Sequence, residues 1–217
     1  VKTTDRADSV IAPLRRSPET VTRGDWREGL PVLRGRQVVL REIRESDAQA
    51  LMTLLATEEV SRFIWEPPSS VEVFEAFIAK ARAQRSAGAC ACYVVTLKGL
   101  DTAIGLFQIR EVTPGLSTTE WGFALASDFW GTGVFSEAAS LVLEFVFNTL
   151  GSHRLEARSA TRNGRGHAAL KKIGAVEEGV LRKSLLRDGG YLDQTLYAII
   201  ADEWRMTNKS ASARFVH

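Results

Sequence analysis

The chain has 217 residues, of which 45% are apolar and 25% charged, so it can bury a core and is expected to form one domain with tails. No run approaches the roughly 20 apolar residues of a membrane span, so no membrane partner is expected. Basic and acidic residues nearly balance, at 28 against 26, which argues against nucleic acid as a partner.

The first part of the chain lacks the apolar segment of a signal or transit peptide. We expect a flexible leader over residues 1–33, a folded domain over 34–205 and a polar tail over 206–217. Cys90 and Cys92 stand one residue apart, too close for an easy disulfide, and are expected to be reduced strand residues. These features favour a cytoplasmic protein.

The first half of the domain combines strand and helix patterns. A strand is predicted over 34–43 and a helix over 47–57, and Ser70 can cap a second helix over 71–85. Two prolines, at 67 and 68, separate these helices. Three strand-like runs follow, over 92–98, 103–112 and 118–125.

The second half begins with a helix whose apolar stripe starts at Val134. A strand over 153–161, a short helix over 165–173 and a closing hairpin follow, and the turn of the hairpin is Asp188-Gly189-Gly190. The order predicts an α/β fold of the α+β type, a mixed sheet of about seven strands with helices on its faces.

The stretch DFWGTGVFSEAA, residues 128–139, places Gly131 and Gly133 directly before the predicted helix. A P-loop is excluded, because there the second glycine is followed by Lys and Ser or Thr. A dinucleotide fingerprint is disfavoured, because the next strand does not end in an acidic residue. Two interpretations remain: a tight turn, or a cradle in which the first helix amides bind an anion such as pyrophosphate.

Gly122 stands in the middle of the strand before this loop. A glycine there indicates a β-bulge or a place where a ligand passes close to the backbone. A bulge that spreads two strands beside an anion-binding helix start would make a slot for a long ligand with a phosphate end.

Several motifs carry a family resemblance: Glu120 before an aromatic-glycine pair, FWGTGVFSEA, HRLEARSATRN, LKKIGA followed by EEGVLRK, and DGGYLDQTLYAI. With them the chain resembles the GCN5-related N-acetyltransferases (GNAT), in the subgroup similar to the RimJ and RimL ribosomal-protein acetyltransferases. The resemblance covers about residues 34–205. It implies a largely antiparallel sheet with splayed fourth and fifth strands.

The sequence departs from the family pattern at three positions. Phe135 replaces a small residue of the glycine loop, Gly166 replaces a Ser, and Ala175 replaces a Phe after Gly174. The first change should alter packing more than anion binding, because amides and not side chains bind the pyrophosphate. The second removes a hydroxyl that could protonate the leaving thiolate.

The resemblance implies acetyl-CoA as co-substrate, no metal, and direct attack of an amine on the thioester. Glu120 is then the candidate base, acting through a water, and the alternative is a carboxylate paired with an arginine. Asn163 could bond the pantetheine arm or orient a water, and its alternative is an ordinary helix N-cap. A backbone amide near Leu125 would hold the oxyanion. The residues expected to bind the cofactor are Phe123, Leu125, Trp130, Gly131, Thr132, Gly133, Val134, Phe135, Ser136, Asn163 and Lys172.

A CoA thiolate resembles that of cysteine, whose pKa is about 8.5, and can leave with little help from an acid. Tyr191, Tyr197 or His167 could still protonate it, and the sequence does not choose among them. Each is also compatible with a structural role.

The first two helices and the last hairpin would line the acceptor side. There Trp65, Glu66, Tyr191 and Asp193 suit a cationic amine, although Trp65 could instead pack in the core and Glu66 form a turn. The acceptor would be a protein N-terminal α-amine or a small amine such as an amino acid, polyamine or antibiotic. Two alternatives remain, an acyl-CoA-binding or sensing domain and, less favoured, a nicotinamide-dependent oxidoreductase. Both a monomer and a homodimer are compatible with the sequence.

Overall fold

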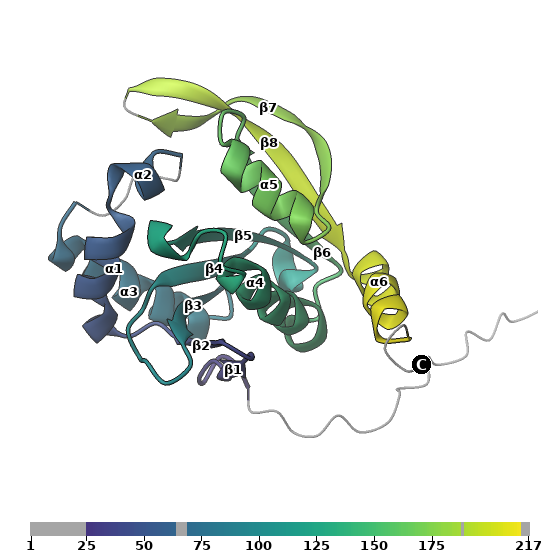
Figure 1. The fold of residues 1–217 in the computed structure, drawn as a ribbon, viewed down its shortest axis with the longest axis horizontal. Helices are drawn as coiled ribbons and strands as arrows, with labels where there is room; N and C mark the ends of the chain where they lie inside the picture. Colours follow the sequence, from purple (N-terminus) through teal and green to yellow (C-terminus); the bar gives the residue numbers. More distant parts are fainter. Residues whose placement is uncertain (1–24, 64–68, 188, 214–217) are drawn as a thin grey trace, which may run out of the picture.

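The structure is a computed structural model, and it describes residues 25–63, 69–187 and 189–213 (Figure 1). In this part of the chain an open sheet of eight strands has the order β1-β2-β3-β4-β5-β6-β8-β7. Neighbouring strands are antiparallel except β5 and β6, which are parallel. The strands are β1 Leu33–Arg34, β2 Val38–Glu42, β3 Cys90–Leu97, β4 Gly105–Glu111, β5 Thr118–Leu125, β6 Arg154–Ala160, β7 Val176–Arg187 and β8 Gly190–Ile200.

Helices cover both faces of this sheet. On one face α1 and α3 pack on side chains such as Cys92 and Val94, and on the other α4 and α5 pack on Tyr93 and Val95. Alternation of side chains along a strand assigns these β3 residues to opposite faces, so β3 is apolar throughout. The helices are α1 Ala48–Leu55, α2 Glu58–Ser61, α3 Val71–Ser86, α4 Val134–Glu144, α5 Gly164–Lys172 and α6 Ala201–Ala213, and a π-helical segment Phe145–Leu150 extends α4.

The predicted fold class is confirmed, and the additional strand is the two-residue β1. Ser70 caps α3 as predicted, since its hydroxyl accepts a hydrogen bond from the amide of Val73. Gly122 does not form a bulge, because β4 and β5 pair without a register shift through Gln108 and Gly122. The prediction of a bulge is therefore wrong.

Both ends of the folded region extend beyond the predicted domain, residues 34–205. Trp26 and Leu30 are buried in the core, and Trp26 packs edge-on against Phe145, so this part of the expected leader is ordered. At the other end α6 includes residues expected in the polar tail. Trp204 packs against Phe147, with 5.2 Å between ring centroids, which holds the start of this helix on the core.

The two cysteines are buried free thiols of β3. Burial raises the pKa of Cys90 to about 11 and raises that of Cys92 as well. Because the thiolate is the reactive form, both side chains are inert at neutral pH.

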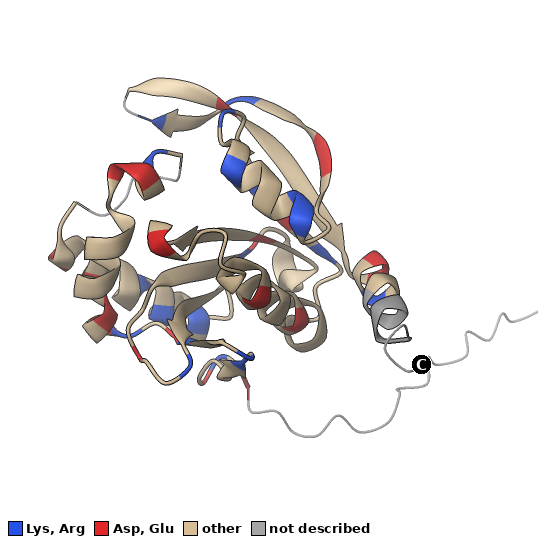
Figure 2. Ribbon diagram, in the orientation of Figure 1, with Lys and Arg blue, Asp and Glu red and all other residues tan. Residues whose placement is uncertain are grey.

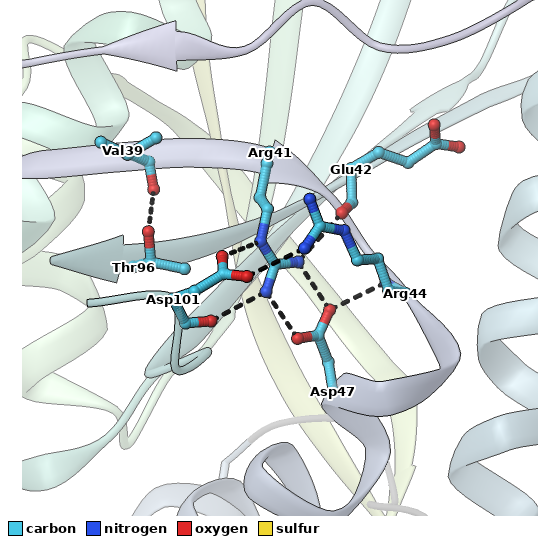
Figure 3. A network of polar contacts seen from close by, with 7 residues as sticks. All are labelled: Val39, Arg41, Glu42, Arg44, Asp47, Thr96 and Asp101. Carbon is cyan, nitrogen blue, oxygen red and sulfur yellow. Dashed lines mark hydrogen bonds and ion pairs between the residues drawn. The ribbon is translucent and has the colours of Figure 1, made fainter. Parts of the chain in front are cut away.

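A buried ion-pair network joins β2, the start of α1 and the loop between β3 and β4 (Figure 3). The guanidinium of Arg41 donates two hydrogen bonds to Asp47, of 2.8 and 2.7 Å, and a third to the Asp101 carboxylate. Asp47 also accepts from the amide of Arg44, whose side chain pairs with Asp101. The bond to Asp47 raises the pKa of Arg41, and the bond from Arg41 lowers that of Asp101. The network fixes the first helix against the sheet.

Candidate functional site

A gap opens between β5 and β6. The two strands pair only from Thr118 to Trp121 on β5, and the rest of β5 has no partner on that side. β6 continues to Ala160 by pairing with β8 instead. These are the fourth and fifth strands of the sequence-based prediction, so their expected splaying is confirmed.

Backbone alternation fixes which amides face the gap. The amide of Ala126 donates to Ile104 at the β4 side, so the peptide groups of Leu125 and Phe123 point the other way. The carbonyl of Leu125 accepts a 2.8 Å hydrogen bond from the indole of Trp130. Its amide faces the gap, as a donor for the oxyanion would.

The glycine loop ends at the start of α4, beside this gap. Gly131 and Gly133 have φ values of 76° and 91°, which only glycine adopts readily, and Gly133 is the N-cap of α4. No hydrogen bond joins the amides of Val134, Phe135 or Ser136 to another described residue. Free amides at the positive end of a helix dipole bind anions. The loop is therefore a tight turn whose free amides could also bind a pyrophosphate, so the two interpretations are compatible.

A cavity of about 590 Å³ connects the loop to the gap. Of the residues expected to bind the cofactor, it is lined by Phe123, Leu125, Trp130, Gly131, Gly133, Phe135, Ser136, Asn163 and Lys172. The other two do not line it: Thr132 donates to the carbonyl of Phe129, and the Val134 side chain is buried in the core. The volume lies within the range of small-molecule sites.

Phe135, which departs from the family pattern, is part of an aromatic cluster. Its ring lies 4.7 Å from that of Phe123 and 5.9 Å from that of Phe107, measured between centroids. The side chain therefore packs under the loop, and the amides of the loop stay accessible.

Trp130 and Arg165 form another wall of the cavity. The guanidinium of Arg165 lies 3.6 Å from the centroid of the indole, a cation–π contact between the glycine loop and α5. Both residues line the cavity. Sequence reasoning found Trp130 from its place in the loop, but the spacing of residues did not indicate Arg165.

Asn163 is the N-cap of α5 and also lines the cavity. Its Oδ1 accepts a 2.9 Å hydrogen bond from the amide of Gly166. Its Nδ2 donor can still reach a ligand, so the two interpretations of Asn163 are compatible.

Gly166 has no room for a side chain. A Cβ there would lie 2.6 Å from Nδ2 of Asn163 and 2.7 Å from Oγ of Ser159, well inside normal contact distances. Ser159 Oγ is buried and has no hydrogen-bond partner among the described residues. Its hydroxyl lies next to the place that a residue-166 side chain would occupy.

We therefore expect Gly166→Ser, which restores the family residue, to lower the stability by about 1–3 kcal/mol through overpacking. It should not raise turnover, because the inserted Cβ displaces Asn163. Chemical denaturation and steady-state kinetics measure both effects. Gly164→Ser, at a position with no atom within 4 Å of the added Cβ, is the matched control. A stable and faster Gly166→Ser enzyme would contradict the prediction.

Glu120 lies outside the cavity lining and is mostly buried, with 17% of its side chain exposed. Its carboxylate is 3.6 Å from the guanidinium of Arg110 and 3.9 Å from that of Arg158. Alternation along β5 places it on the same face as Gly122 and Ala124. Ala124 lines the cavity, and a Cβ at Gly122 would meet no atom within 4 Å, so open space leads from the carboxylate toward the cavity.

The candidate acids His167 and Tyr197 lie away from the cavity. They bond to each other at 2.7 Å, and His167 also contacts the carbonyls of Ala160 and Thr161. Tyr197 donates to Glu177, and burial, together with the charge of Glu177, raises the pKa of the phenol. Tyr191, the third candidate, is exposed on the β7–β8 hairpin.

Tyr191 and Asp193, two of the four residues expected on the acceptor side, do not line the cavity. Trp65 and Glu66 fall outside the described residues. The carboxylate of Asp193 accepts a 2.7 Å bond from the amide of Lys183, at a register shift between β7 and β8. It stabilises the irregular hairpin rather than contacting the cavity.

Sequence reasoning missed the wall that α2 contributes. Glu59, Val60, Arg62 and Phe63 line the cavity opposite the glycine loop. The helix has only four residues, too few for an apolar periodicity to be visible in the sequence.

No helix in the described part of the chain is long and apolar enough to cross a membrane. No group of three or more His, Cys, Asp or Glu residues is arranged there to hold a metal ion.

Comparison with known proteins assigns the chain to a family. The family model of the acetyltransferase (GNAT) domain matches residues 37–176. An N-acetyltransferase of Bacillus subtilis named as uncharacterized, YoaA, is 26% identical over 178 residues, which cover 78% of this chain and 97% of that protein. The ribosomal protein uS5-alanine N-acetyltransferase of Escherichia coli is 26% identical over 102 residues, 46% of this chain and 53% of that protein.

A solved structure, Mycobacterium smegmatis RimJ in complex with CoA-disulfide, superposes with a TM-score of 0.70 at 26% identity and covers 80% of this chain and 87% of that one. That solved structure contains a CoA derivative, and its fold is similar to that of this chain. The chain belongs to the GNAT acetyltransferase family and is an N-acetyltransferase.

Proposed function

We propose that this protein transfers an acetyl group from acetyl-CoA to a primary amine by direct attack on the thioester. The observation that carries the proposal is the cavity that runs from the glycine loop into the gap between β5 and β6. The amides at the start of α4 can bind an anion, and the β5 amides that face the gap can bind a carbonyl. This arrangement suits a long ligand that has a phosphate at one end and a carbonyl at the other.

The residues present fit acetyl-CoA. The amides at the start of α4 would hold the pyrophosphate, with Lys172 at the rim, and Asn163 Nδ2 would bond the pantetheine arm. The amide of Leu125 would donate to the thioester oxygen, where negative charge develops. When bound, the co-substrate supplies an activated acetyl group and a thiolate leaving group.

Glu120 is the proposed base. An extended strand advances about 3.3 Å per residue, so Glu120 and Ala124 are roughly 13 Å apart and the carboxylate can act only through water. Arg110 and Arg158 lie 3.6 and 3.9 Å from the Glu120 carboxylate and would orient it. The open space beside Gly122 is the route for the water.

The acceptor that we favour is the α-amine of a peptide or protein N-terminus. The Escherichia coli relative is named as an alanine N-acetyltransferase of ribosomal protein uS5. A free small amine remains the second candidate, and an acyl-CoA-sensing domain would bind the co-substrate without turnover.

Glu120→Gln tests the base. We expect turnover of peptide substrates to fall by about 10²-fold or more, within the range for general base catalysis, with unchanged affinity for acetyl-CoA. Thiol release and calorimetric titration measure the two quantities. Glu156→Gln is the matched control, since Glu156 is Glu120's register partner on β6 and has a similar exposure and an arginine neighbour.

An equal loss in both variants would contradict Glu120 as the base. If the parent protein binds acetyl-CoA but acetylates no amine, the sensing alternative replaces the proposed function.

A further inference from the structure

A second cavity, of about 520 Å³, adjoins the first. It is lined by three arginines, Arg62, Arg162 and Arg187, together with Phe63 and Leu192. These residues come from four separate places: the segment after α2, the turn after β6, the end of β7 and the start of β8. Only the folded chain brings them to one place.

The two cavities are connected through Arg62 and Phe63, which line both. The glycine loop lines the first cavity but not the second, so a ligand held there by its pyrophosphate would extend its acyl end toward the second. An acceptor that enters from the second cavity would therefore place its amine at the thioester, and the three arginines would surround the rest of the acceptor.

The described residues that line the second cavity carry only basic charge. Its lining contains no Asp or Glu among the described residues. No ion pair joins Arg62 or Arg162 to a described carboxylate, and Arg62 instead lies over the ring of Phe63, 5.3 Å from its centroid. Figure 2 shows basic segments after α2 and at the end of β7, on the same side of the molecule.

Clustered guanidinium groups repel one another, and an anion relieves that repulsion. Arginine binds carboxylates through two parallel hydrogen bonds, which gives both affinity and orientation. A polyamine or another polycation would be repelled from the same cavity. The sequence-based prediction was different: an aromatic wall with carboxylates nearby, which suits a cationic amine.

We infer that the acceptor is anionic close to its reactive amine: a peptide N-terminus followed within a few residues by acidic side chains, which Arg62, Arg162 and Arg187 bind. The inference rests on the proposed acetyl transfer and specifies its substrate. Phe63 and Leu192 provide the apolar surface that the peptide backbone covers.

The test uses three peptides that begin with the same residue, with sequences starting Ala-Asp-Glu, Ala-Asn-Gln and Ala-Lys-Arg. The full-length protein and saturating acetyl-CoA are used, and thiol release gives kcat/KM for each peptide. We expect the acidic peptide to exceed the amide peptide by about 10-fold or more, the size of a charge-assisted contact. Higher salt should reduce this preference.

Arg162→Gln should lower kcat/KM for the acidic peptide by about 10-fold and leave that for the amide peptide nearly unchanged. Arg162→Glu should invert the order, so that the basic peptide becomes the better substrate. Arg82→Gln, at an exposed position of α3, is the control and should change neither. A general loss of folding would lower the rates on all three peptides together. A loss of peptide recognition would change the rates on the three peptides differently.

Equal rates on the three peptides would overturn the inference and leave the acetyltransferase function intact. Acetylation of free glutamate and aspartate in place of the peptides would keep the anionic site and assign it to a small acceptor. Calorimetric binding of acetyl-CoA without acetylation of any acceptor would overturn the proposed function, and this inference with it.

Discussion

Gly133→Glu is expected to lower the affinity for acetyl-CoA by at least about 100-fold. The N-cap position has a φ of 91°, which costs a non-glycine residue about 1–2 kcal/mol, and the new carboxylate would occupy the anion cradle. Calorimetric titration of the variant and its parent measures the loss.

Gly99→Glu is the matched control for this variant. Gly99 has a φ of 88° and an open environment in the loop between β3 and β4, so the same strain and charge are introduced away from the cradle. It should bind acetyl-CoA like the parent. Equal binding by Gly133→Glu would mean that the glycine loop is only a turn into α4.

Arg41→Met is expected to lower the free energy of unfolding by about 3–5 kcal/mol. The substitution leaves Asp47, whose side chain is 5% exposed, as a buried carboxylate without its cation. Urea denaturation measures the loss. The double variant Arg41→Met/Asp47→Leu should recover most of it, because no buried charge then remains unpaired.

Arg44→Ala is the control for the exposed part of this network and should lower the free energy of unfolding by less than about 1 kcal/mol.

The stabilising effect of Asp101 depends on pH. Hydrogen bonding to Arg41 lowers its pKa from 3.8, so its contribution is present above that value and is lost as the pH falls below about 4. A loss of stability with Arg41→Met no larger than that with Arg44→Ala would contradict the importance of the buried pair.

The anionic acceptor changes the interpretation of the substrate side. In the sequence, aromatic and acidic side chains suggested a site for a cationic amine. These side chains are Trp65, Glu66, Tyr191 and Asp193. In the structure Asp193 instead accepts a hydrogen bond from the amide of Lys183 in the hairpin. The arginines of the second cavity give no comparable signal, because they are 25 to 125 residues apart in the sequence.

Local patterns were sufficient for most of the fold. The apolar run of β3, the cap at Ser70 and the Gly131–Gly133 loop before α4 depend on backbone preferences and side-chain periodicity, which short stretches of sequence contain. The short helix α2 and the helix α6 were missed. Packing on the rest of the fold supplies the stabilisation of α6, through Trp204, and a four-residue helix has no periodicity of its own.

The sequence by itself determined the fold class, the glycine loop and the resemblance that makes acetyl transfer the proposed reaction, because each depends on residues close together in the chain. Only the tertiary structure decided how the site is built. It placed Glu120 between two arginines, left no room beside Gly166, and gathered Arg62, Arg162 and Arg187 around one cavity. These are contacts between distant segments, and their energies depend on burial and geometry that no local pattern encodes.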